Sequence, residues 1–187
     1  VVEEPTPPVE VEFKRVYRIV HQLPWIDLAV EGSETSPVTA SITGENSIKV
    51  TNLTDTGFTV VWLSKQKEKG YVNYGTSKSN LNNTANDSRD GLITQGEYYV
   101  HNVDISKLQP ETAYYYEIKS GTNTYDNDGI KYTINTFATQ SSPPAFESIK
   151  GKYSNLPSHG EAVLMASIQD ADDTGTSGRS FPISTVI

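Results

Sequence analysis

Cysteine is absent from this 187-residue chain, and methionine occurs only once. The absence of cysteine excludes disulfides, thiol catalysis and thiolate ligands for a metal. No run of 18 apolar residues occurs, so no segment is expected to cross a membrane as a helix. No long window keeps a helical apolar period either, and the sequence therefore disfavours a helical fold.

Basic residues are scarce as well, because 15 Lys and Arg stand against 23 Asp and Glu and give a net charge of −8. Nucleic-acid binding needs a basic face, and docking on anionic lipid needs basic clusters. The charge therefore excludes nucleic acid as a partner and argues against direct membrane association. We interpret the acidity as a solubility feature.

The chain is rich in Thr, Ser, Asn, Val and Ile, and it contains 11 Tyr. Val, Ile, Thr and Tyr suit the pleated surface of a sheet, whereas Asn, Ser and Gly suit turns. Short apolar segments separated by turn signals are typical of a β-sandwich. The predicted strands cover 47–53, 58–63, 69–75, 98–105, 112–120 and 130–137. A charged hairpin is predicted at 65–69, and a long polar loop with short pieces of edge strand at 76–91.

This pattern divides the chain into four regions. Residues 1–10 are Pro-rich and are predicted to form an extended linker. Residues 11–40 form an N-terminal extension, predicted as a strand plus a loop, and 41–139 form the sandwich. Residues 140–187 are predicted to be a partial second β-domain or strands that pack on the N-terminal extension.

The two flanking regions are expected to meet. Residues 11–20 read as a strand, with a short amphipathic helix as the alternative, and strands are predicted at 146–153, at 162–168 and from 185 onward. Three strands are too few for an independent core. We therefore expect 11–20 to pair with strands from 146–168, and both termini look like those of a fragment of a longer polypeptide.

The most informative local motif lies between Leu108 and Ile118. A turn that contains Pro110 leads into a strand, and Tyr114 stands near the start of that strand. In immunoglobulin-like sandwiches a Tyr at this point hydrogen-bonds back to the backbone of the turn.

Residues 44–139 resemble a fibronectin type III domain. The resemblance rests on Trp62, Val72 and Tyr74, on the turn and strand that contain Leu108, Pro110, Thr112, Tyr114 and Tyr116, and on the closing segment 136–139. Two segments, 71–81 and 101–116, are more narrowly similar to the fibronectin-like N-terminal domain of purple acid phosphatases.

The resemblance implies an all-β fold, namely an immunoglobulin-like (fibronectin type III) β-sandwich with additional flanking strands. It assigns structural roles to Trp62, Tyr74, Leu108, Pro110 and Tyr114. The phosphatase family carries its metal ligands in a separate catalytic domain, and no matching Asp/His/Asn set follows residue 140. The catalytic activity is therefore not carried over, and the chain is predicted not to be an enzyme.

One segment has the first half of a calcium loop. Asp170, Asp172 and Thr174 alternate as oxygen donors before Gly175, but Phe181 stands where the bidentate acid belongs. A calcium site at these three residues is a hypothesis beside a solvated acidic turn, and no other cofactor is expected.

Other polar and aromatic residues give weaker signals. Tyr98, Tyr99 and Tyr115 are candidates for an outward surface that stacks on sugars or anchors a protein, with cross-strand packing as the alternative. The three His are dispersed and form no metal motif, so His101 is expected to have a structural or a surface role. Three Asn-x-Ser/Thr motifs begin at Asn52, Asn82 and Asn86, although chance matches are expected in so Asn- and Thr-rich a chain.

The leading interpretation is a non-catalytic module of a larger surface or secreted prokaryotic protein, acting as a spacer or as an adhesion or protein-interaction domain. One alternative is a carbohydrate-binding accessory module of an extracellular enzyme. Another is the N-terminal fragment of a metallophosphatase-like enzyme. The expected location is extracellular or at the cell surface, and the expected partner is a protein or glycan there. The C-terminal edge strand would also permit self-association between chains.

Overall fold

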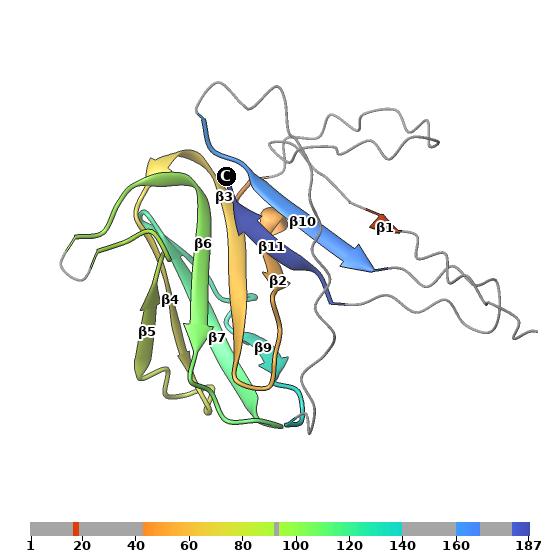
Figure 1. The fold of residues 1–187 in the computed structure, drawn as a ribbon. Helices are drawn as coiled ribbons and strands as arrows, with labels where there is room; N and C mark the ends of the chain where they lie inside the picture. Colours follow the sequence, from red (N-terminus) through yellow and green to blue (C-terminus); the bar gives the residue numbers. More distant parts are fainter. Residues whose placement is uncertain (1–16, 19–42, 92–93, 140–159, 169–180) are drawn as a thin grey trace, which may run out of the picture.

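The computed structural model describes residues 17–18, 43–91, 94–139, 160–168 and 181–187, and these form an all-β fold (Figure 1). The central part is a sandwich of two antiparallel sheets. The first sheet has the order β2-β3-β6, formed by Lys49–Thr51, Gly57–Glu68 and Tyr98–Ser106. A short 3-10 helix, η1 (Gly44–Ser47), precedes it, and no helix in the described part is long and apolar enough to cross a membrane.

The second sheet is built around β7 (Ala113–Ser120). Its path is β5-β4-β7-β8, with β5 at Asn83–Asn86, β4 at Gly70–Gly75 and β8 at Asn123–Tyr125, while β9 (Tyr132–Asn135) pairs with the other part of β7. The expected sandwich is therefore confirmed, and the two sheets enclose the main core. That core contains Leu53, Phe58, Val60, Trp62, Val72, Val103, Ile105, Leu108, Tyr114, Tyr116 and Ile118.

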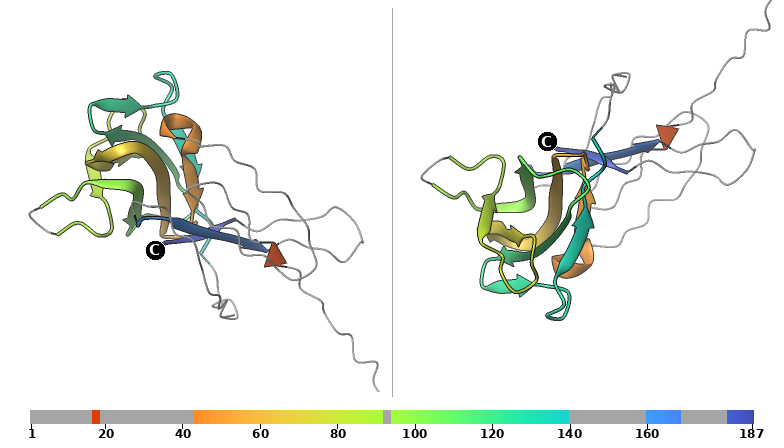
Figure 2. Two further views of the ribbon diagram at one scale, coloured as in Figure 1. Left: turned by 90° about the horizontal axis from the view of Figure 1, so that it is seen from above. Right: turned by 90° about the horizontal axis from the view of Figure 1, so that it is seen from below.

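A third layer consists of β10 (Val163–Ile168), β11 (Ile183–Val186) and β1 (Tyr17–Arg18), in the order β1-β10-β11. Its strands β10 and β11 pack on the outer face of the first sheet, whereas β1 lies on the side of β10 away from the sandwich (Figures 1 and 2). The contact is apolar, and it buries Val61, Leu63, Val100 and Val163, with Met165 and Val186 packed against them. The C-terminal strands thus pack on the sandwich itself, whereas the prediction was that they pack on the N-terminal extension or belong to a partial second β-domain.

The pairing that was expected between the flanking regions is present at two positions. Tyr17 is opposite Ile168 and Arg18 is opposite Ser167 in an antiparallel arrangement. The expected strand at 146–153 lies outside the described residues, and the four region boundaries remain a prediction.

The predicted hairpin at 65–69 is wrong. β3 continues to Glu68, and β4 pairs with β5 and β7 but not with β3, so the chain crosses from one sheet to the other at Lys69. Charged residues led to the expectation of a turn. β3 instead extends past its apolar part because Glu68 still pairs with Tyr98 of β6 after a register shift.

The turn before β7 has the expected tyrosine arrangement. The Gln109 amide donates a hydrogen bond of 2.9 Å to the Tyr114 hydroxyl oxygen. Leu108 is buried beneath this turn, and its amide donates to the Thr56 carbonyl at 3.0 Å. The turn is thereby tied to the start of β7 and to the β2–β3 connection.

Replacing Tyr114 by Phe should lower the free energy of unfolding by about 1 kcal/mol, because one intramolecular hydrogen bond is lost while the ring stays in the core. Urea unfolding of the variant measures this loss. Tyr71→Phe is the matched control, because the Tyr71 hydroxyl bonds to nothing in the described part of the chain. Equal stabilities of the two variants would contradict the role given to Tyr114.

Candidate functional site

The three tyrosines predicted as a binding surface do not lie together. Tyr98 and Tyr99 are in β6 of the first sheet, whereas Tyr115 is in β7 of the second. The Arg89 guanidinium covers the Tyr98 ring, with Cζ 3.7 Å from the ring centroid, and Lys78 Nζ lies 5.4 Å from the centroid of Tyr115. Any role of these tyrosines in binding remains a prediction, but it would involve two separate surfaces.

The proposed calcium ligands Asp170, Asp172 and Thr174 lie outside the described residues. Within the part of the chain that the structure describes, no three His, Cys, Asp or Glu side chains gather in a way that could hold a metal ion. Calcium binding therefore remains a prediction from the sequence.

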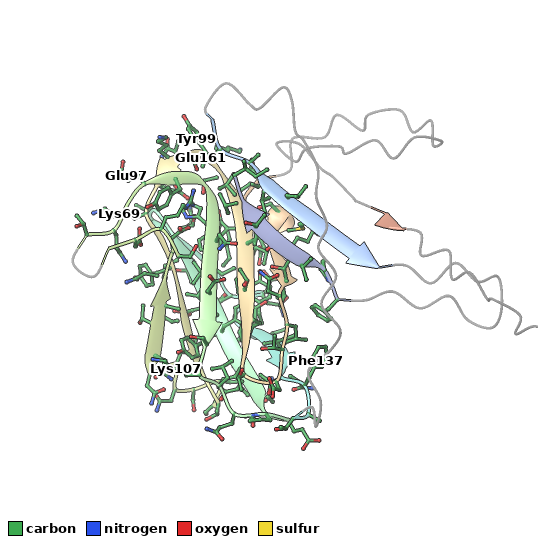
Figure 3. The ribbon with its side chains drawn as sticks, viewed as in Figure 1. Lys69, Glu97, Tyr99, Lys107, Phe137 and Glu161 are labelled. Atoms are coloured by element: carbon green, nitrogen blue, oxygen red, sulfur yellow. The ribbon has the colours of Figure 1, made fainter. Side chains whose placement is uncertain are left out.

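A polar cluster centred on Glu161 lies where β6 and β10 begin (Figure 3). The backbone amides of Tyr99 and Val100 both donate to Glu161 Oε2, at 2.9 and 3.1 Å. Consecutive amides of a regular strand point in opposite directions, so their convergence on one oxygen marks an irregular strand. The register between β3 and β6 shifts at this position, between Leu63 and Glu68.

Arg89 connects this carboxylate to the rest of the sandwich. Its Nη1 lies 3.7 Å from Glu161 Oε2, and it binds Asp87 in a bidentate manner at 2.8 and 3.0 Å. The Asp87 side chain is fully buried and also accepts a 2.8 Å hydrogen bond from the Asn102 amide. Burial lowers the pKa of Arg89, but its hydrogen bond to Asp87 and the charges of Asp87 and Glu161 outweigh burial and raise it.

We call Glu161, Arg89, Asp87 and the Tyr99–Val100 amides the Glu161 anchor. The Arg89 guanidinium and the two amides form a binding site for a carboxylate, and the side chain of Glu161 occupies that site. Two amide donors and a guanidinium are a strong set of ligands for one carboxylate. Lys67 Nζ, 3.7 Å from Glu161 Oε1, adds little because its side chain is half exposed. The arrangement therefore fastens the third layer to β6.

A second polar group lies at the same end of the core. It is a series of hydrogen-bonded side chains that we call the His101 chain, formed by Trp62, Ser64, Glu68, His101 and Ser120. Trp62 Nε1 donates to Ser120 Oγ at 2.8 Å, and Ser120 Oγ donates to Glu68 Oε1. Ser64 Oγ also donates to Glu68, at 3.0 Å, and lies 3.0 Å from His101 Nε2. The Glu68 carboxylate can only accept, so it orients both hydroxyls and favours the tautomer in which His101 Nε2 donates to Ser64.

The His101 chain contains the residue types of a hydrolytic triad but not its geometry. In a triad the carboxylate orients the imidazole through Nδ1, whereas Glu68 here contacts the serines. His101 Nδ1 has no partner in the described structure. His101 is fully buried and stacked on Trp62, with ring centroids 4.5 Å apart, and burial lowers its pKa to about 4. The group therefore links β3, β6 and β7, and of the two roles expected for His101 its burial favours the structural one over the surface one.

Gly70 closes this group from the β4 side. A Cβ atom at this position would lie 2.4 Å from His101 Nδ1 and 2.5 Å from Trp62 Cζ2. Real Cβ atoms do not approach other atoms so closely, so the crossing from β3 to β4 over the stacked rings requires glycine.

The Glu161 anchor was not among the sites predicted from the sequence. A lone Glu between Gly160 and Ala162 carries no motif, and Arg89 lies in a segment that was interpreted as a polar loop. One signal was available, because Val60–Leu63 is an uninterrupted apolar run rather than an alternation. Such a run is typical of a strand that is covered on both faces. A second layer over β3 would in turn need residues that attach it to the sandwich.

The comparison with known families gives one match. The model of the family described as purple acid phosphatase, N-terminal domain, matches residues 45–139. This region is about half of the chain and includes every strand from β2 to β9. No curated protein matches the chain.

Stability should depend on pH through His101. Its pKa falls from an ordinary 6.5 to about 4 in the folded state, so between these values the unfolded chain binds the extra proton. The free energy of unfolding therefore has its full contribution from neutral His101 above pH 6.5. It falls by about 3 kcal/mol as the pH decreases towards 4. Urea unfolding between pH 7.5 and 4.5 measures the loss, and His101→Gln should flatten the profile. A flat wild-type profile would show that the imidazole is not held neutral by burial.

Replacing Glu161 by Ala should cost about 2–4 kcal/mol, because the Tyr99 and Val100 amides lose a charged acceptor and Arg89 loses an ion pair. Equilibrium unfolding measures the cost, and hydrogen exchange of residues 98–102 should rise in parallel. Glu97→Ala is the matched control, since Glu97 lies nearby and is exposed. If both variants lose the same small amount, the anchor has no energetic role.

Proposed function

The chain belongs to the purple acid phosphatase N-terminal domain family, and from that premise we propose that it is a non-catalytic β-sandwich module of a larger surface or secreted prokaryotic protein. In that protein it acts as a spacer or as an adhesion or protein-interaction domain. Its location is extracellular or at the cell surface, and its partner there is a protein or a glycan. The fibronectin-like sandwich by itself is compatible with many functions, and the attachment of its neighbouring segment is the feature that favours a spacer.

The observation that carries the proposal is the attachment of the third layer at two separate points. The first is the Glu161 anchor at the start of β10. The second is Asn52, whose amide Oδ1 accepts a 2.9 Å hydrogen bond from the Ser184 amide while Nδ2 donates to the Ser184 carbonyl at 3.1 Å. The backbone N–H of Asn52 also donates to the Pro182 carbonyl at 2.9 Å.

Two polar attachments on either side of an apolar contact prevent the β10–β11 hairpin from pivoting on the sandwich. A spacer has to keep its neighbours at a fixed distance and orientation, and relative motion of neighbouring parts is the default unless the contact between them is large and hydrophobic. The combination of Val61, Leu63 and Val100 with the two attachments supplies the rigidity that this function needs.

A second candidate function is favoured by the family match. Such a module could be the N-terminal part of a metallophosphatase-like enzyme, in which a further domain holds the metal ligands. In that case the rigid third layer would set the position of the catalytic domain. This alternative and the spacer differ in the activity of the natural full-length protein.

The proposal is tested in source cells with an amine-reactive biotin reagent that does not cross membranes. Exposed lysines of the sandwich, such as Lys65, Lys69 and Lys78, should be labelled equally in intact and lysed cells. Labelling only after lysis would contradict the proposed location. Hydrolysis of p-nitrophenyl phosphate by the full-length protein with added iron or zinc would favour the phosphatase alternative instead.

A further inference from the structure

The structure separates the three Asn-x-Ser/Thr motifs into two kinds. At Asn52 the side-chain nitrogen Nδ2 donates to Thr59 Oγ1 at 3.0 Å as well as to the Ser184 carbonyl. Both of its hydrogens are in use, and the residue lies partly buried beneath β11. A substituent on this nitrogen would remove one donor and displace the hairpin.

Asn82 and Asn86 present the opposite arrangement. Both are exposed, and only their carbonyl oxygens are engaged: Asn82 Oδ1 accepts from Asn83 Nδ2 at 3.0 Å, and Asn86 Oδ1 accepts from Gln95 Nε2 at 2.9 Å. Neither Nδ2 donates a hydrogen bond within the described part of the chain. The nitrogen that carries an N-linked sugar is therefore available at both positions.

The hydroxyl residue at the third position of each motif is exposed too. Thr84 and Ser88 are exposed, although the Thr84 hydroxyl donates to Asn73 Oδ1 and the Ser88 hydroxyl accepts from Asn102 Nδ2, both at 2.9 Å. Side chains at alternating positions of an extended strand lie on one face, so Thr84 and Asn86 share a face of β5.

The position of β5 in the sheet allows an enzyme to reach these residues. Among the described residues β5 pairs with β4 alone, through four residue pairs, and it forms the margin of its sheet (Figure 1). A short edge strand can separate locally from the sheet at low free energy. Asn52 cannot be exposed without the loss of the third layer.

We propose that Asn82 and Asn86 are N-glycosylation sites and that Asn52 is not, an inference that rests on the extracellular location proposed above. Asn Nδ2 forms a bond to the anomeric carbon of a sugar carried on a lipid phosphate. The bond from that carbon to the phosphate oxygen breaks, and the proton of Nδ2 leaves with the phosphate. Sugars at both ends of β5 would shield its unpaired edge from another sheet, which counteracts self-association through this edge.

Peptide mapping of the native protein from its source cells tests the proposal. Cleavage after Lys and Arg releases residues 79–89, which contain both proposed sites, and residues 50–65, which contain Asn52. Peptide 79–89 should carry the mass of one or two glycans, and fragmentation should place them on Asn82 and Asn86. Peptide 50–65 should have its unmodified mass.

Matched variants make the test specific. Thr84→Ala should remove the sugar from Asn82 alone, Ser88→Ala should remove it from Asn86 alone, and the double variant should remove both. A sugar-free 79–89 peptide, or a sugar on Asn52, overturns the proposal. If the native protein carries no sugar but biotin still labels it on intact cells, the glycosylation proposal is wrong and the proposed location stands. If biotin labels it only after lysis, the proposed location is wrong as well.

Discussion

The burial of β3 on both faces is the constraint on which the rest of the structure depends. Phe58, Val60 and Trp62 face the second sheet, while Val61 and Leu63 face the third layer, and all five are at most 2% exposed. A strand that is apolar on both faces is stable only when a layer covers each of them. The fibronectin-like sandwich provides one cover, and the β10–β11 hairpin provides the other.

Polar groups then determine how the layers align, since apolar contacts alone are not directional. The Glu161 anchor lies where the register between β3 and β6 shifts, and it accepts hydrogen bonds from two consecutive amides of β6, those of Tyr99 and Val100. Asn52, with a φ of 51°, turns its side chain towards β11 and takes the place of a pairing strand for Ser184. Inside the core, the hydrogen bonds of the His101 chain link β3, β6 and β7. Each group thus satisfies backbone or buried donors that the layered arrangement would otherwise leave unpaired.

Much of the sandwich could be predicted because its signals are local. Pro110 and Tyr114 lie four residues apart and define the turn before β7, and the Tyr114 hydroxyl meets the Gln109 amide as expected. The third layer could not be placed from the sequence, because its contacts join distant segments, for example Thr51 Oγ1 and Ser184 Oγ at 2.6 Å across 133 positions. Neither Glu161 nor Asn52 belongs to a motif that reports such a contact. The aromatic candidates Tyr98, Tyr99 and Tyr115 were named as a group because residue type does not tell in which sheet a strand will lie.

The central claim is that the sandwich and the third layer form one cooperative unit. Native-state hydrogen exchange tests it most directly, by comparing the amides that pair β10 with β11 against those that pair β3 with β6. The account predicts that both sets exchange only through global unfolding, with free energies that agree within about 1 kcal/mol. Rapid exchange of the β10–β11 amides while β3 remains protected would contradict it, because the hairpin would then open on its own and could not hold a neighbouring segment in place.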